Sequence, residues 1–181
     1  MTKQSQLKKV AREINNCRTC QRGKLGMAVP GEGSPSAKIM FIGEAPGKSE
    51  AATGRPFVGR SGQLLRKLIR SCGIKEKDVF ITSPVKYLPK KGTPSAKDIK
   101  HGKSHLQKQI DIIKPKVMVL LGNTACKAML SDKYPVMSNH GRFINENGNN
   151  YFMTLHPAAV IRFPKYRPVI NRDFKKLNKL V

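Results

Sequence analysis

The sequence predicts an α/β fold, a single three-layer αβα domain over residues 1–181 with a central, mostly parallel four-stranded sheet. Short, continuously apolar runs alternate along the chain with longer segments whose apolar residues recur at helical spacing. Turns rich in glycine, proline or polar residues follow several of these runs, which is typical of the carboxyl ends of parallel strands. A hydrophobic content of 39% in 181 residues is enough for one core.

The first part of the chain predicts one helix, one loop and the first core strand. Lys3 to Asn16 has apolar residues at helical intervals, which predicts a short basic helix. The glycine- and proline-rich stretch from Gln21 to Ala37 predicts a loop that leads to a strand over Ile39 to Ile42. Ala51 to Gly62 is a second, glycine-punctuated loop. An amphipathic helix around Leu64 to Ile69 follows it.

The second part predicts the remaining strands and a long helix. Asp78 to Thr82 and Val117 to Leu121 are short apolar runs, and each predicts a buried strand. Ser95 to Lys114 reads as a helix that ends before a proline. Arg142 to Ile144 and Tyr151 to Thr154 predict a hairpin, whose second arm runs directly into Leu155, His156 and Pro157.

Two further helices are expected late in the chain. Asn123 or Thr124 is suited to cap a helix that runs to Leu130. The tail from Tyr166 to Val181 predicts a closing helix. Cys72 stands at the end of the amphipathic helix and is expected to be a buried apolar residue rather than a ligand.

Net charge is the strongest global property of the chain. The sequence has 35 Lys and Arg residues against 11 Asp and Glu, a formal charge of +24. The commonest partner of such a one-sided charge is a polyanion such as nucleic acid, and the alternative is a solvated basic surface. No apolar run can span a membrane, and the polar start lacks the apolar middle of a secretory signal. We expect a monomer in a cytoplasmic or nuclear-type compartment that is neither secreted nor bound to membranes.

The four cysteines do not suit a disulfide framework in such a compartment. They are Cys17, Cys20, Cys72 and Cys126. Only Cys17 and Cys20 have the spacing of metal ligands, and two ligands alone are half a site. Metal binding, redox chemistry and burial all remain open for the cysteines.

The stretch from Lys38 to Glu50 predicts a functional edge of the sheet. Its apolar strand ends at Gly43 in a Glu-Ala-Pro-Gly turn, and α/β proteins bind ligands outside the carboxyl ends of their strands. Glycines allow the backbone to approach a ligand closely, and Glu44 and Glu50 bring carboxylates to the turn. Further polar turns, which contain Ser83 and His156, follow other strands and can converge on the same edge.

Five blocks of sequence occur in a fixed order. They are GEAPGKSE, GRPFVG, VFITSPVKY, VMVLLGN and TLHPAAVIR. In content, order and spacing they resemble the uracil-DNA glycosylase superfamily, and they are most like its family four, known for an iron–sulfur cluster. The resemblance covers the chain from Cys17 to the final helix. It implies a monofunctional DNA repair enzyme that flips uracil out of DNA and hydrolyses its N-glycosidic bond.

The resemblance also implies roles for individual residues. Because uracil leaves as an anion and the sugar becomes cationic, excision needs hydrogen-bond donors at the base and acceptors near the sugar. His156 is the candidate donor to the uracil O2 atom. Glu44 and Glu50 both remain candidates for orienting the water, and we favour Glu44 because it lies inside the motif.

Two further sets of residues follow from the resemblance. Phe57 resembles the aromatic that stacks on the extruded base, and the expected base-binding set is Gly43, Ala45, Pro46, Gly47, Phe57 and Ser83. The run after His156 resembles a loop that wedges into the duplex, and the expected DNA contacts are Ser34, Ser36, Pro157, Ala158, Val160 and Arg162. The other histidines, His101, His105 and His140, lack such a context and are expected at the surface or in a groove.

The chain departs from the family pattern at two places. Ser83 stands where family four has an asparagine, and a single hydroxyl predicts weaker discrimination between uracil and cytosine. Tyr87 and Gly102 stand at two of the four cysteine positions of the cluster. We therefore expect no cofactor and a four-iron four-sulfur cluster replaced by packing, although His101 could substitute for one of the missing thiolates beside Cys17 and Cys20.

Two alternative functions remain open on the same fold. One is a basic DNA-binding protein with weak or no catalysis, which would explain both the charge and Ser83. The other is a glycosylase for another deaminated base, such as hypoxanthine or xanthine. Whether the DNA partner is single- or double-stranded is also open.

Overall fold

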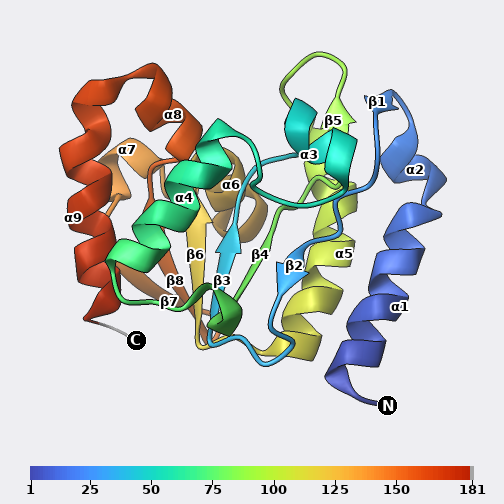
Figure 1. Cartoon of the computed structure of the whole chain (residues 1–181), viewed down its shortest axis with the longest axis horizontal. Helices are drawn as coiled ribbons and strands as arrows, with labels where there is room; N and C mark the ends of the chain where they lie inside the picture. Colours follow the sequence, from blue (N-terminus) through green and yellow to red (C-terminus); the bar gives the residue numbers. More distant parts are fainter. Residues whose placement is uncertain (180–181) are drawn as a thin grey trace.

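A six-stranded sheet between two layers of helices forms the centre of the computed structural model, which describes residues 1–179 (Figure 1). The strand order is β2-β4-β3-β6-β8-β7. The bounds are β2 (Glu32–Gly33), β3 (Ile39–Ile42), β4 (Val79–Thr82), β6 (Val117–Leu121), β7 (Phe143–Glu146) and β8 (Asn149–Thr154). A separate antiparallel pair joins β1 (Lys24–Leu25) to β5 (Leu88–Pro89).

The four central strands run parallel, so the prediction of an α/β fold with a mostly parallel sheet is confirmed. The sheet has six strands within residues 1–179 rather than four. Each edge gains a short antiparallel strand: β2 pairs with β4, and β7 pairs with β8 as the expected hairpin. The two-residue strand β2 lies in a stretch whose many glycines and prolines predicted only a loop.

Helices cover both faces of the sheet. On one face α4 (Arg60–Ser71), α8 (Pro157–Arg162) and α9 (Arg167–Asn178) pack together (Figure 1). On the other face α5 (Ala96–Ile113) contacts α6 (Asn123–Leu130) and carries α1 (Lys3–Asn15) on its outer side. The remaining helices are α2 (Arg18–Gln21), α3 (Lys48–Thr53) and α7 (Val136–Asn139), with 3-10 turns at Glu76–Asp78, Ser131–Lys133 and Pro164–Tyr166.

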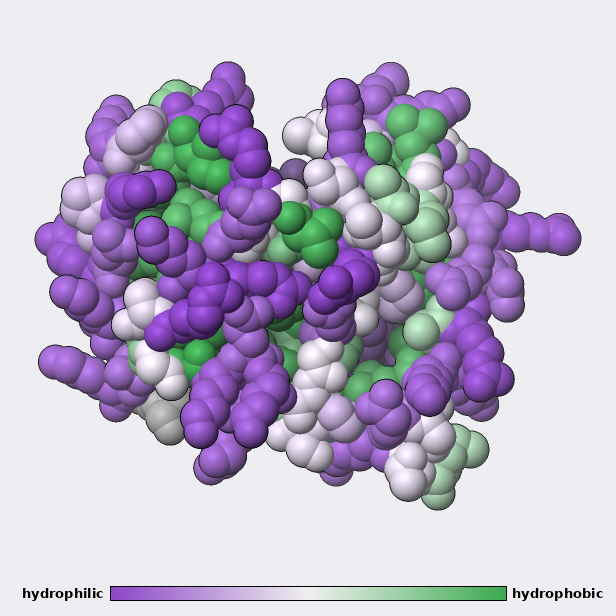
Figure 2. Space-filling view, in the orientation of Figure 1, coloured by the Kyte–Doolittle hydropathy of each residue, from purple (hydrophilic) through white to green (hydrophobic). Residues whose placement is uncertain are grey.

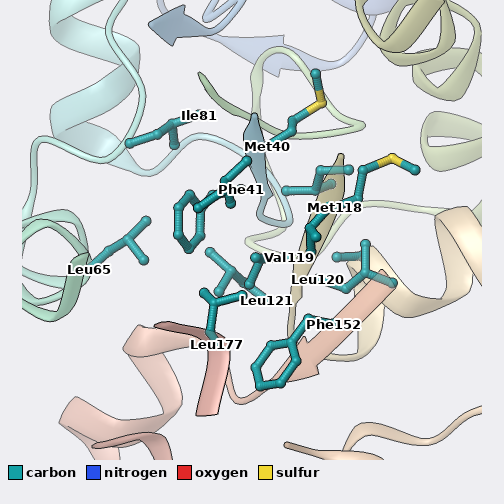
Figure 3. Packing of buried hydrophobic residues seen from close by; sticks show 14 of the residues in the cluster. Met40, Phe41, Leu65, Ile81, Met118, Val119, Leu120, Leu121, Phe152 and Leu177 are labelled. Atoms are coloured by element: carbon teal, nitrogen blue, oxygen red, sulfur yellow. The ribbon is translucent and has the colours of Figure 1, made fainter. Parts of the chain in front are cut away.

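The hydrophobic core forms around β3 and β6, whose residues are all buried. Successive side chains of a strand point to opposite faces: Phe41 faces Leu65 of α4, while Met40 points away from it (Figure 3). The Phe41 ring also stacks on Phe174 of α9, with 6.0 Å between ring centroids. Fully burying a side chain of this size contributes about 1.5–3 kcal/mol, so these contacts fix the sheet against the α4 and α9 layer.

Several helices differ from the prediction in detail. Helix α3 extends to Thr53, so the beginning of the stretch predicted as a loop from Ala51 to Gly62 is helical. The run after His156 forms α8 rather than a loop. Helix α6 is capped by Gly122, which has a φ of +83°, so Asn123 is its first residue. The closing helix is present as α9, but the last two residues predicted for it lie outside the described part of the chain. Among residues 1–179, no helix is long and apolar enough to cross a membrane.

Candidate active site

A cavity of about 220 Å³ opens at the carboxyl ends of the central strands. Figure 2 shows the hollow at the top of the molecule, between the part that carries α8 and the part that carries α3 and β5. The turns that follow β3, β4 and β8 all contribute to its wall, as the sequence predicted. Its lining residues are Val29, Glu44, Ala45, Pro46, Gly47, Glu50, Pro56, Phe57, Ser61, Ser83, Leu88, Gly92, His156 and Ala158.

His156 follows β8 and caps helix α8. Its Nδ1 atom accepts a hydrogen bond from the backbone N–H of Ala158 at 3.1 Å. Because Nδ1 accepts, the neutral ring carries its proton on Nε2, which makes Nε2 a donor. Burial lowers the pKa of His156 below its ordinary value of 6.5, and the opposing effect of Glu44 is smaller. The site therefore holds a neutral imidazole whose N–H is free for a ligand.

Phe57 stands beside this imidazole. The two rings are 5.8 Å apart between centroids and tilted by 31°. Phe57 is only 9% exposed and has a φ of +52°, so a strained backbone holds an aromatic wall in the cavity. A Cβ atom at Gly43 would lie 2.7 Å from the Phe57 ring, which shows that the ring lies directly against the strand end. A side chain at position 43 would displace it.

The two glutamates differ in their surroundings. Glu44 lines the cavity, and its Oε2 atom accepts one hydrogen bond from the Thr124 hydroxyl of α6 at 2.5 Å. Glu50 is 8% exposed, and its two carboxylate oxygens accept from the backbone N–H groups of Gly47, Val58 and Gly59 at 3.1, 2.8 and 2.8 Å. Glu50 thus joins the turn after β3 to the loop that carries Phe57.

Ser83 is buried at the end of β4 and is part of the cavity wall. Its hydroxyl donates to the carbonyl oxygen of Val85 at 2.7 Å. Since a hydroxyl has one proton and two lone pairs, the Ser83 oxygen keeps acceptor capacity and has no proton left for a ligand. At this position the chain offers a hydrogen-bond acceptor.

A fully buried lysine, Lys86, binds residues that are next in sequence to the wall residues Val29 and Ser83. The Lys86 amine donates to the Pro30 carbonyl, the Thr82 hydroxyl and the Gln109 side-chain oxygen at 3.1, 2.7 and 2.9 Å. Burial lowers the pKa of Lys86 to about 7, whereas three acceptors match the three donors of an ammonium group. Sequence analysis did not identify this network. The lysine links the loop at Pro30 to β4 and α5.

Not all of the expected DNA contacts lie near the cavity. Ala158 lines it, and Arg162 is exposed at the end of α8. Val160 is 1% exposed and belongs to the core, so its expected role as a surface wedge is wrong. Pro157 is buried as well. Both side chains face inward because they are three positions apart in a helix and so lie on the same face of it.

Ser34 and Ser36 also differ from expectation. The Ser34 N–H donates to the carbonyl oxygen of Val79 at 2.9 Å. Val79 begins β4, whereas the cavity lies beyond the other end of this strand. The antiparallel strand β2 leads the chain away from the cavity. Both serines therefore lie near the start of β4, at the opposite ends of the central strands from the cavity.

A second group of polar side chains lies between α2 and α5. One ligand atom from each of Cys17, Cys20, His101 and His105 lies within 4.8 Å of all the others, a grouping that could hold a metal ion. The Cys17 sulfur is 3.2 Å from Nε2 of His101. His105 is 7% exposed rather than at the surface, and both of its ring nitrogens are buried without a hydrogen-bond partner. The sequence analysis had considered His101 beside Cys17 and Cys20, but it did not identify His105 as the fourth member of the group.

The four-cysteine ligand set of the family-four cluster does not fit this chain. The buried Tyr87 donates its hydroxyl to the carbonyl oxygens of Ile14 and Asn15 at 3.4 and 3.2 Å. A Cβ atom at Gly102 would lie 1.9 Å from the Pro84 carbonyl oxygen, so the backbone there leaves no room for a cysteine side chain.

The remaining titratable residues of interest lie apart from both groups. Cys72 is the C-cap of α4 and Cys126 lies within α6, and both are buried, so the expected burial of Cys72 is confirmed. Burial raises the pKa of the Cys126 thiol to about 12, which keeps it protonated. His140 is partly exposed, which agrees with the expectation of a surface or groove residue, and its Nδ1 atom is 3.2 Å from the Asp173 carboxylate.

Comparisons with known proteins match the chain mainly to uracil-DNA glycosylases. A family model described as the uracil DNA glycosylase superfamily matches residues 30–179. The chain is 38% identical to a type-4 uracil-DNA glycosylase of Sulfurisphaera tokodaii, over 96% of this chain and 84% of that protein. It is 36% identical to the type-4 enzyme of Pyrobaculum aerophilum, over 92% and 90% of the two chains. A type-5 uracil-DNA glycosylase of Pyrobaculum aerophilum is 30% identical, over 75% and 67%.

Proposed function

Because the chain belongs to the uracil-DNA glycosylase superfamily, we propose that it excises uracil from DNA by hydrolysing the N-glycosidic bond and leaves an abasic site. The observation that carries this proposal is the cavity in which the Nε2 donor of His156, the Phe57 ring and the Glu44 carboxylate face one space. The type-4 glycosylases among the relatives support the same activity. We also propose that residues 1–181 form one domain.

The base is bound first. A uracil flipped out of the stack enters the cavity and stacks on Phe57, a contact that contributes about 1–3 kcal/mol per base. The Ser83 oxygen accepts a hydrogen bond from the N3–H group of uracil, since its own proton is donated to Val85. Cytosine has no hydrogen on N3 and presents a lone pair there instead. One acceptor can therefore favour uracil over cytosine without an asparagine.

The leaving group is stabilised by His156. As the C1′–N1 bond breaks, the bonding electron pair goes to the uracil ring and negative charge grows on O2. The neutral imidazole donates its Nε2–H to this oxygen, and the hydrogen bond strengthens as the charge develops. The lowered pKa keeps the ring neutral at pH 7, with its other nitrogen fixed by the Ala158 N–H.

The sugar and the water are assigned to Glu44. Its carboxylate lies in the cavity with one hydrogen bond from Thr124, which leaves lone pairs for a water molecule. The water oxygen forms a bond to C1′, and its proton passes to Glu44 or to solvent. Glu50 acts as a positioning residue, because three backbone N–H groups already occupy its carboxylate.

DNA is the expected partner. A charge of +24 favours the phosphate backbone and predicts a steep dependence of affinity on salt concentration. Helix α8 stands at the mouth of the cavity, with Ala158 in its wall and Arg162 exposed at its far end. We assign these two residues to contacts with the strand around the flipped nucleotide, and Arg162 to a phosphate.

Single-turnover excision tests the proposal. The protein is mixed with matched oligonucleotides that carry uracil, hypoxanthine or no lesion, single- and double-stranded, with a chelator present. Release of uracil supports the assignment, and release of hypoxanthine alone would transfer the substrate to another deaminated base. Tight, salt-dependent binding with no release from any substrate would leave a DNA-binding protein without catalysis.

A further inference from the structure

We propose that Cys17, Cys20, His101 and His105 bind one zinc ion, which holds α2 against α5 in place of a polynuclear cluster. The proposal is independent of uracil excision. It depends on four observations: the ligand types, their spacing in the sequence, their separation in space and the unpartnered state of His105.

The sequence spacing is that of a structural zinc site. Cys17 and Cys20 are separated by two residues, and His101 and His105 by three. Structural Cys₂His₂ zinc sites use pairs of this type, in which the two histidines lie one turn apart on the same side of a helix. Here α5 supplies the histidine pair, while α2 and the residue that precedes it supply the cysteines.

The separation of the ligand atoms suits a single ion. Zinc binds sulfur at about 2.3 Å and nitrogen at about 2.0 Å, so ligand atoms around one tetrahedral ion are about 3.3–3.8 Å apart. The four atoms here lie within 4.8 Å of one another, so small side-chain adjustments bring them to these distances. A cluster of several metal and sulfide ions is larger and holds its four ligands farther apart. Two thiolate and two nitrogen ligands in this geometry favour zinc.

His105 indicates that something outside the chain completes the group. Both of its ring nitrogens are buried, and neither has a partner among residues 1–179. Burying a polar atom without a partner is unfavourable, and native structures rarely leave one unsatisfied. A metal bond to one nitrogen would remove much of this cost.

The charge of the surroundings also fits. Arg22, Lys24, Lys86 and Lys97 line the cavity of about 240 Å³ beside Cys20 and His101, with Asp98 as the acidic member. A bare divalent cation would be repelled here. Zinc bound by two thiolates and two neutral imidazoles has no net charge, so the site adds nothing to the local excess of positive charge.

Metal analysis of the full-length chain, purified anaerobically with a reductant, tests the proposal. The expected result is about one zinc per chain and no inorganic sulfide. After removal of the metal, Co²⁺ is expected to give the visible spectrum of a tetrahedral thiolate site, and Zn²⁺ to displace it. Iron with inorganic sulfide in the purified protein would overturn the proposal in favour of a cluster.

Variants locate the ligands. His105→Ala is expected to lower zinc affinity more than about 100-fold, beyond the effect of a residue that only supports a ligand. His105→Cys keeps a fourth ligand and is expected to retain zinc and the fold, which guards against loss through misfolding. The matched controls Cys72→Ala and Cys126→Ala remove thiols outside the group and are expected to keep one zinc per chain. Equal zinc affinity of His105→Ala and the unmodified chain would refute the site.

Discussion

The two polar groups on this molecule differ in how completely the chain satisfies them. In the cavity, Glu50 accepts three backbone N–H groups, and Glu44, Ser83 and His156 each have a partner within the protein. Between α2 and α5, His105 has none among the described residues. The first group is already organised for a substrate that comes and goes. The second lacks a partner for His105, and we interpret this difference as one between the proposed catalytic pocket and the proposed metal site.

The largest effect is expected from His156→Ala. Removing a donor that acts on the developing charge lowers the single-turnover rate by about 100- to 1000-fold. DNA affinity is expected to change little, because the hydrogen bond from His156 strengthens only as charge develops on the leaving base. Fluorescence anisotropy with an uncleavable substrate analogue would measure this affinity. Equal losses of rate and affinity would instead indicate that His156 is structural.

Paired changes at the two glutamates should separate catalysis from positioning. Glu44→Gln is expected to lower the excision rate about 100-fold and leave stability almost unchanged. Glu50→Gln replaces an acceptor of three N–H bonds and is expected to lower the free energy of unfolding by about 1.5–3 kcal/mol in urea. The reverse pattern would exchange the two roles.

Ser83→Ala tests whether a single acceptor reads the base. The change removes the bond to Val85 and the proposed contact to uracil N3–H, at a cost of about 1 kcal/mol or a five-fold loss of rate. The ratio of uracil to cytosine release from matched substrates should fall by the same factor. Ser104→Ala, on the exposed side of α5, is the control. An unchanged ratio would assign base reading to other groups.

The smallest effect concerns pH. Burial lowers the pKa of His156 in the folded chain, while the unfolded chain titrates near the ordinary value of 6.5. Between these two values the unfolded state binds more protons, so stability falls as the pH falls through this window and is constant above it. Urea titrations at a series of pH values give the free energy of unfolding of the protein and of His156→Gln. The slopes of these free energies against pH should differ only below pH 6.5. Identical slopes would mean that the pKa is not lowered.

Residues in short apolar runs allowed most of the sheet to be predicted. The runs that became β3, β4, β6 and β8 are fully or largely buried, and their apolar character is a local property that the sequence carries. The run that forms α8 was expected to be a loop because it resembles the duplex-wedging loop of the family, and its six residues are too few to show a periodic pattern. Its burial of Val160 depends on packing against α4, which the local sequence does not contain.

The same contrast applies to the sites. Glu44, Phe57, Ser83 and His156 meet in one cavity as expected, because each follows or faces the end of a parallel strand. His105 was missed because it lies outside the cluster positions of the family pattern, and its partners Cys17 and Cys20 are more than eighty positions away. The spacing of three residues between His101 and His105, read together with the cysteine pair, was the available signal.

Helix α1 is synthesised well before α5, yet it depends on α5 for its long-range contacts. The Lys3 amine donates to the carbonyl oxygen of Ile113, and Glu13 pairs with Lys108 at 2.9 and 2.6 Å respectively. Contacts over such sequence separations form late because a long loop must close first. On the ribosome, the N-terminal helix must therefore wait until α5 has emerged, and its docking completes one face of the molecule rather than starting it.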